Sequence, residues 1–218
     1  MSDEELFATI REKLFTAVIG DVMDAAGLIR QFLPPEIRAL RADGMVVGRA
    51  MTVLEADTEY GQDAGFGLMF RALDDLKPGE VYVCTGASPI YALWGGLMSA
   101  RAMSLGAVGA VVDGHHRDTR EILGLGFPVF SAGAYAQDQR LRGQVVDYRR
   151  PITFRNGCTV AAGDVIVGDI DGVLAMPAAE AEDIVRAALD KVTGEEKVRK
   201  MILAGGRSED AFNETGIM

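Results

Sequence analysis

The middle of the chain alternates helices with buried strands, and this alternation constrains the fold more than any other feature. A helix rich in Ala, Leu and Met is predicted over Leu93–Leu105, and the continuous apolar run Ala107–Val112 is typical of a strand buried on both faces. A short helix over Thr119–Leu125 and a strand over Val129–Ser131 follow. This strand–helix–strand order predicts an α/β fold with parallel strands at its centre.

The flanking segments predict helices at both ends and further strands. Within residues 1–30, Ser2 and Glu5 have the spacing of a capping box, and a second helix follows Thr16 and stops at Gly27. The following elements are also expected: helices over Phe66–Leu76, from Pro177 onward and over Glu195–Ala204, and strands over Met45–Leu54 (broken by Gly48), Val81–Thr85, Val145–Tyr148, Ile152–Phe154, Val165–Val167 and Val173–Met176. We expect one domain over residues 1–218, a layered α/β sandwich with a mixed sheet and a C-terminal helical extension over residues 178–218.

Composition excludes several classes of protein. Hydrophobic residues make up 49% of the 218, enough for a sizeable core. The net charge of −10 argues against nucleic-acid and membrane partners, which attract Lys and Arg. No apolar run reaches the roughly 18 residues of a membrane span, and the acidic start is unlike a signal peptide, so a cytoplasmic location is expected. Cys84 and Cys158 are expected to be buried thiols.

The densest polar cluster is Asp113-Gly114-His115-His116-Arg117-Asp118, directly after the predicted buried strand. Ligands of open α/β sheets gather at the carboxyl ends of strands, which favours a functional site here. The alternative is a solvated turn in which Asp118 caps the next helix. Carboxylates with scarce His suit Mg²⁺ or Mn²⁺ better than Zn²⁺.

Three weaker candidates stand elsewhere in the chain. Gly95 and Gly96 open the predicted helix, where backbone N–H groups could bind an anion, although paired glycines more often serve turning or close packing. Asp21 and Asp24 share a helix face and either bind a metal or, as we favour, are solvated. Glu55, Asp57 and Glu59 alternate after a strand, which favours a charged sheet edge.

Three stretches resemble one known family: W-G-G-L-M-S-A, then V-V-D-G-H-H-R-D-T-R-E, then V-x-x-G-D-V-I-V-G-D-I-D-G-V-L-A-M-P at Val160–Pro177. The family is named for the regulator of ribonuclease E activity A (RraA) and includes divalent-metal 4-hydroxy-4-methyl-2-oxoglutarate aldolases. The resemblance covers roughly Thr16 to Gly205. It implies a fold like the swivelling β/β/α domain of phosphohistidine proteins, and homotrimers or hexamers with sites at subunit interfaces.

The resemblance also implies roles for particular residues. The aldolase motif D-x20-R-D-x2-E/D matches Arg117, Asp118 and Glu121, so Arg117 would bind the substrate's carboxylate or oxo group and Asp118 would hold the metal. The loop that binds the 2-oxo acid falls on Gly95, Gly96, Leu97 and Met98. One position departs from the motif, because Gly96 stands where the aldolases carry Asp.

Together with the resemblance, these residues predict a lyase that uses Mg²⁺ or Mn²⁺ and acts on a small 2-oxo acid through a pyruvate enolate. Arg117 and the metal would stabilise the enolate, Glu121 would orient a metal-bound water, and His116 is a candidate for proton return. Gly96 favours oxaloacetate decarboxylation over aldol cleavage, because decarboxylation needs no base for an alcohol. The alternatives are a non-catalytic regulator that binds a protein, or a lyase for a different hydroxy or sugar acid.

Overall fold

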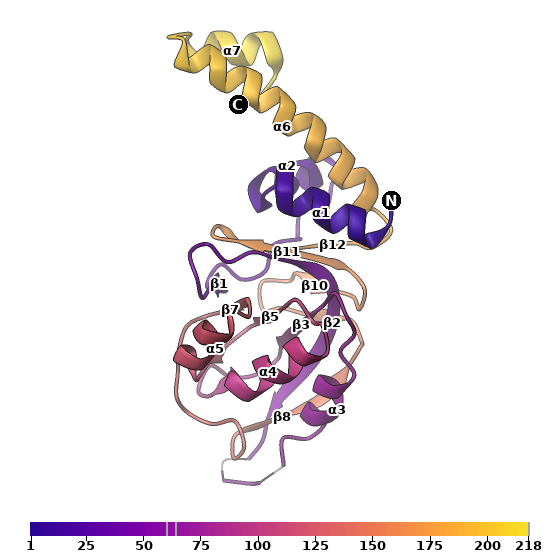
Figure 1. The fold of residues 1–218 in the computed structure, drawn as a ribbon, viewed down its shortest axis with the longest axis vertical. Helices are drawn as coiled ribbons and strands as arrows, with labels where there is room; N and C mark the ends of the chain where they lie inside the picture. The colour runs from indigo at the N-terminus through magenta and orange to yellow at the C-terminus, as the bar shows by residue number, and fades with distance from the viewer. Residues whose placement is uncertain (60, 64, 218) are drawn as a thin grey trace.

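A computed structural model describes residues 1–59, 61–63 and 65–217, and its largest element is a mixed sheet. Figure 1 shows the sheet at the centre of the molecule, with helices on its faces. In sheet order, the strands of the described residues are β1 (Arg38–Ala39), β7 (Val129–Ser131), β5 (Gly109–Val112), β3 (Glu80–Thr85), β2 (Val46–Asp57), β11 (Val165–Asp169) and β12 (Gly172–Met176), with β8 (Gly143–Tyr148) also paired to β2.

The centre of the sheet is parallel, as the sequence predicts. Strands β2, β3, β5 and β7 pair in parallel, whereas β1, β8, β11 and β12 pair with their neighbours antiparallel. The crossovers carry α3 (Met69–Asp74), α4 (Gly96–Ser104) and α5 (Thr119–Leu125), which lie together on one face of the sheet (Figure 1). The predicted mixed α/β architecture is therefore confirmed.

The segment around residues 31–39 almost closes this sheet on itself. Phe32 forms a bridge with Leu174 of β12, and six residues later Arg38 pairs with Ser131 of β7, so one segment contacts both edges. One core cluster lies between the inner face of this sheet and a small hairpin, which is formed by β9 (Ile152–Thr153) and β10 (Thr159–Val160). The cluster includes Val83, Val111, Phe130, Phe154 and Ile166.

Helices from both chain ends pack together beside β11 and β12. They are α1 (Asp3–Lys13), α2 (Thr16–Ala25) and the long α6 (Ala181–Leu203), and their apolar side chains form a separate core cluster. The capping box of Ser2 and Glu5 is present as predicted. The far half of α6 extends away from the body, where α7 (Ser208–Thr215) folds back along it (Figure 1).

The sequence reasoning was wrong about the C-terminal helices and about Gly48. Two helices were expected, one from Pro177 and one over Glu195–Ala204, but α6 is continuous, and the absence of a side chain at Gly194 makes room for Ile217. Gly48 was expected to break a strand, but β2 continues through it, since a Cβ there would meet Val108 at 2.7 Å and the carbonyl of Gly79. Both glycines therefore permit close packing.

Two smaller expectations can also be compared with the structure. Cys84 and Cys158 are buried free thiols, as predicted. No helix in the described part of the chain is both long and apolar enough to span a membrane.

Candidate active site

The predicted helix over Leu93–Leu105 begins later than expected, and its first residues form a strand. Strand β4 (Ala92–Trp94) pairs in parallel with β6 (His115–His116), so the turns that follow the two strands lie side by side. The N–H of Arg117 donates to the carbonyl of Trp94 over 2.9 Å. This pairing brings position 96 next to Arg117 and Asp118 although 20 residues lie between Gly96 and Arg117 in the sequence.

Two glycines at the start of α4 face two carboxylates from the start of α5. A Cβ on Gly95 would stand 2.9 Å from Oδ2 of Asp118, and a Cβ on Gly96 would overlap the carboxylate of Glu121. The same Oδ2 of Asp118 accepts a hydrogen bond from the N–H of Gly96 over 3.1 Å. The glycine pair therefore allows both carboxylates to approach the helix start closely.

Asp118 stands at the N-cap position of α5 but does not cap that helix with its side chain. Its backbone is left-handed, with φ of 59°, a conformation that Asp and Asn adopt more readily than most residues. The alternative of a helix-capping Asp118 is therefore wrong, because its carboxylate serves the N-terminus of the neighbouring helix α4.

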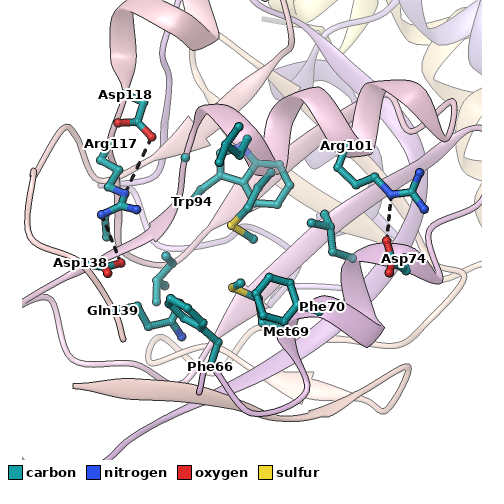
Figure 2. Close-up of a pocket in the computed structure, with 16 residues that line it drawn as sticks. Phe66, Met69, Phe70, Asp74, Trp94, Arg101, Arg117, Asp118, Asp138 and Gln139 are labelled. Carbon is teal, nitrogen blue, oxygen red and sulfur yellow. Dashed lines mark hydrogen bonds and ion pairs between the residues drawn. The ribbon is translucent and has the colours of Figure 1, made fainter. Parts of the chain in front are cut away.

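Arg117 is held between two carboxylates. Its Nη1 lies 3.2 Å from Oδ1 of Asp138, and its Nε lies 3.8 Å from Oδ2 of Asp118. All three side chains are about 40% exposed, so the guanidinium is oriented by ion pairs yet open to a ligand. Figure 2 shows the three residues together at one end of the cavity.

His116 directly precedes Arg117 in the sequence, but its side chain is bound to Ser131 and Thr119 instead of facing the cavity. Its ring is 2% exposed, with Nδ1 2.7 Å from Oγ of Ser131 and Nε2 3.0 Å from Oγ1 of Thr119. Burial, reinforced by the neighbouring His115, lowers the pKa of His116. The residue does not line the cavity that Arg117 and Asp118 border.

That cavity lies between α3 and α4 and has a volume of about 400 Å³. Gly95, Leu97 and Met98 of the predicted substrate loop line it together with Arg117 and Asp118 (Figure 2). Trp94, which begins the W-G-G-L-M stretch singled out in the sequence, also lines the cavity. Sequence reasoning missed the remaining walls: Phe66, Met69, Phe70, Leu73, Asp74, Ala92, Leu93, Arg101, Asp138 and Gln139. Asp138 and Gln139 follow β7, so the rule that ligands gather at strand carboxyl ends was the available signal for them.

Glu55 is not part of a charged sheet edge, and that expectation was wrong. It lies on β2, which is paired on both sides, and it is only 2% exposed. Its Oε2 accepts a hydrogen bond from Nε2 of Gln139 over 2.6 Å, and Gln139 lines the cavity. Burial raises the pKa of Glu55 to about 8, although the hydrogen bond from Gln139 opposes the shift.

Asp21 and Asp24 have structural partners. Asp21 lies 3.2 Å from the ammonium of Lys191 on α6, and Asp24 accepts a hydrogen bond from Gln31 over 3.0 Å. These contacts tie α2 to its surroundings.

The donor set near Gly95 and Gly96 suits a hard cation that keeps much of its water. Within residues 1–59, 61–63 and 65–217, no group of three or more His, Cys, Asp or Glu is placed to hold a metal. Asp118 and Glu121 nevertheless bring two carboxylates to adjacent glycines. Mg²⁺ commonly binds through one or two carboxylates plus water, so these residues fit Mg²⁺ or Mn²⁺ better than a cation that needs a full protein cage.

Comparison with known proteins identifies the family. The family model described as "RraA-like: Aldolase/RraA" matches residues 16–175, and the chain belongs to this family. A protein of Halalkalibacterium halodurans named "Putative 4-hydroxy-4-methyl-2-oxoglutarate aldolase" is 31% identical over 204 residues, covering 93% of this chain and 91% of that protein. The resemblance that the motifs indicate is thereby confirmed.

Solved structures agree on the fold, but their descriptions differ. Streptomyces coelicolor RraAS2, described as an unusual member of the RNase ES inhibitor RraA family, superposes with a TM-score of 0.80 at 25% identity, covering 91% of this chain and 97% of that chain. A structure described as novel cellulases from gut-associated microbes has a TM-score of 0.83 at 32% identity, covering 90% and 88%. Because one fold carries such different descriptions, the reaction has to be argued from the site.

Proposed function

We propose that the protein is a divalent-metal-dependent carbon–carbon lyase that cleaves a small 2-oxo acid through a pyruvate enolate. The observation that carries this proposal is the meeting of Arg117, Asp118 and Gly95 at one end of a cavity, with the N–H of Gly96 bound to Asp118. An enolate-forming site requires a cation to stabilise the developing negative charge, a carboxylate, and backbone groups that lie close to the reacting atoms.

Arg117 is the residue that binds the substrate anion. Its guanidinium would hold the carboxylate or the 2-oxo oxygen, and it would stabilise the negative charge that develops on that oxygen as the bond breaks. Asp138 and Asp118 fix the orientation of the guanidinium from two sides. A Mg²⁺ or Mn²⁺ held by Asp118, with Glu121 beside it, would supply Lewis-acid polarisation of the 2-oxo group.

Aldol cleavage breaks the C3–C4 bond of a 4-hydroxy-2-oxo acid. The hydroxyl proton leaves, C4 becomes a carbonyl, and the electron pair of the broken bond forms the enolate, which takes a proton at C3 to give pyruvate. Glu121 does not line the cavity, but its carboxylate fills the space of a side chain at position 96, so we assign Oε2 of Glu121 to accept the hydroxyl proton through water. Proton return by His116 remains a prediction, and with both ring nitrogens engaged it would pass through Thr119.

Oxaloacetate decarboxylation is a second reaction of the same site. Loss of the C4 carboxylate as CO₂ leaves the same pyruvate enolate, and no alcohol has to be deprotonated. Arg117 would stabilise the same developing charge in both reactions. We expect measurable decarboxylation even where aldol cleavage is slow.

Pyruvate release tests the proposal. Purified protein is assayed with oxaloacetate and a panel of 4-hydroxy-2-oxo acids, with Mg²⁺, with Mn²⁺ and in excess chelator. We expect metal-dependent pyruvate release that the chelator abolishes. If no compound releases pyruvate, the lyase proposal fails and the non-catalytic regulator becomes the better interpretation, in line with the RraA description of some relatives.

Other expectations accompany this proposal. The family resemblance predicts a homotrimer or hexamer, a fold like the swivelling β/β/α domain, and a cytoplasmic location. The oligomer is checked by light scattering at micromolar concentration, where a monomeric mass would contradict it.

A further inference from the structure

We propose that the preferred substrate is a 2-oxo acid whose C4 carries an uncharged apolar substituent, aromatic or branched aliphatic, which binds between α3 and α4. This inference rests on the proposed lyase function and names its substrate class. It depends on the shape, lining and charge of the cavity beyond Arg117.

The lining of the cavity is charged at one end and apolar in the middle. Arg117, Asp118 and Asp138 stand at one end, and the middle is walled by apolar side chains, with Phe66, Met69 and Phe70 visible opposite Trp94 in Figure 2. Phe66 and Phe70 meet edge to face, with ring centroids 5.7 Å apart, so together they form an aromatic corner.

Several of these walls are rigid. Trp94 is buried, its indole N–H donates to Ser99 over 2.7 Å, and its ring lies 4.9 Å from that of Tyr82. Phe66 adopts a left-handed backbone with φ of 66°, which is costly for a bulky residue, and its carbonyl accepts a hydrogen bond from Val145 of β8. An aromatic residue held in this conformation at a cavity wall points to a role in binding.

Two apolar side chains on this cavity are unusually exposed. Leu97 is 82% exposed, and Phe70 is 57% exposed. An apolar ligand group in the cavity would remove part of both surfaces from water, which favours binding in proportion to the apolar area covered.

The volume leaves room for such a group. About 400 Å³ lies within the range of small-molecule pockets. A pyruvate unit has only six non-hydrogen atoms, so a 2-oxo acid anchored at Arg117 leaves much of the apolar section free. The part of the substrate that becomes the carbonyl product would occupy that section.

The charges of the lining argue against a second carboxylate on the substrate. Among the described residues that line the cavity, the cations are Arg117 and Arg101, and the acids are Asp74, Asp118 and Asp138. Arg101 already pairs with Asp74, with 2.8 Å between Nε and Oδ1. Within the lining that this chain supplies, a carboxylate on C4 would therefore be desolvated against apolar walls beside a cation that is already paired with Asp74.

A substrate series that varies only the C4 substituent tests this inference. The full-length protein with Mg²⁺ is given 4-hydroxy-2-oxobutanoate and its 4-phenyl, 4-isopropyl and 4-carboxyl derivatives, with oxaloacetate as a reference for enolate formation. Pyruvate is the common product, so kcat/KM values compare directly. We expect the phenyl and isopropyl compounds to exceed the carboxyl compound by at least about tenfold.

Two variants locate the preference in the cavity. Phe70→Ala is expected to lower the phenyl-to-carboxyl ratio of kcat/KM by about tenfold. Leu97→Lys is expected to lower the same ratio by supplying a cation for the carboxylate. The control is Ile170→Ala, which changes an equally exposed apolar residue in the turn between β11 and β12 and is expected to leave the ratio unchanged.

The outcomes separate this inference from the proposed function. Pyruvate release with a preference for the carboxyl compound contradicts the proposed apolar substituent, and so does a phenyl-to-carboxyl ratio that Phe70→Ala does not change. Neither result contradicts the proposed lyase function. No pyruvate from any compound, oxaloacetate included, overturns both. An apolar preference that Phe70→Ala and Leu97→Lys both reduce supports the inference.

Discussion

The carboxylate of Glu121 lies over the Cα of Gly96, in the space that a side chain at position 96 would take. Family resemblance places an Asp at this position in the aldolases. Here the carboxylate of Glu121 reaches the same place from α5. The aldolase motif combines the Asp at this position with the E/D at position 121, so this chain has one carboxylate fewer than the motif, and we infer that Glu121 takes the place of the missing Asp.

Exchanging the two carboxylates tests that inference. Gly96→Asp alone forces two carboxylates into one space, so we expect pyruvate release to fall about tenfold through repulsion and displacement of Glu121. In the double variant Gly96→Asp with Glu121→Ala only one carboxylate remains, and much of the activity should return. The assay is metal-dependent pyruvate release from oxaloacetate and a 4-hydroxy-2-oxo acid.

The single variants Gly96→Ala and Glu121→Ala serve as controls for size and for loss of charge. The backbone at Gly96 has no positive φ, so alanine is tolerated there once Glu121 rotates away. A double variant no more active than Gly96→Asp would contradict the exchange.

Asp118→Asn should abolish metal-dependent activity and leave the fold intact. Asn adopts the left-handed backbone of residue 118, and its amide oxygen still accepts the hydrogen bond from Gly96, so only the negative charge is lost. We expect a loss of at least about a hundredfold in kcat/KM with unchanged circular dichroism. Asp183→Asn, which removes a charge from an exposed site on α6, is the matched control. Full activity of Asp118→Asn would exclude this residue as the metal ligand.

Arg117→Lys separates charge from geometry at the anion-binding end of the cavity. Lysine keeps the positive charge but lacks the planar fork that can face a ligand while paired with Asp138. We expect kcat/KM to fall about ten- to a hundredfold. The same change at Arg120, on the exposed surface of α5, should have no effect. Equal activity of the two variants would show that a point charge suffices.

The sequence predicted the central fold well because its signals there are local. Continuous apolar runs and closing glycines mark β5, β7 and α5 without reference to the rest of the chain. Prediction failed where long-range packing decides the structure: two C-terminal helices were expected where α6 is continuous, and Ile217 packs against Gly194 within that helix. The start of α4 was placed too early because the pairing of β4 with β6 has no local signal.

In the candidate site, too, the residues with local sequence signals were predicted and those placed by long-range packing were not. Arg117, Asp118 and the glycine pair were found because they follow predicted elements directly and match a motif. The walls of the cavity come from α3 and from the loop after β7, and no periodicity connects Phe70 or Asp138 to Arg117. Glu55 was misread because a strand buried on both faces and an edge strand share the same alternation of charges.

The burial of Glu55 predicts how stability depends on pH. Its pKa is raised to about 8 in the folded protein, so between its ordinary pKa of 4.5 and pH 8 the folded state holds a proton that the unfolded state releases. The stability that this group contributes is fully present below pH 4.5 and is lost as pH rises toward 8. Around it, burial raises the pKa values of Tyr82, Cys84 and Tyr91, which therefore stay neutral over this window.

Urea unfolding from pH 5 to pH 9 measures this effect. The free energy of unfolding of the unaltered protein should fall by up to about 1.4 kcal/mol per pH unit through this group. Glu55→Gln should flatten that dependence, because glutamine keeps an acceptor for Gln139 and carries no charge to bury. At pH 8 the variant should therefore be the more stable protein, whereas near pH 5 the two should be similar. Glu59→Gln, the same change at an exposed position of the same segment, should leave the pH dependence as it is. Parallel curves for Glu55→Gln and the unaltered protein would show that Glu55 ionises in the folded state as readily as in the unfolded chain.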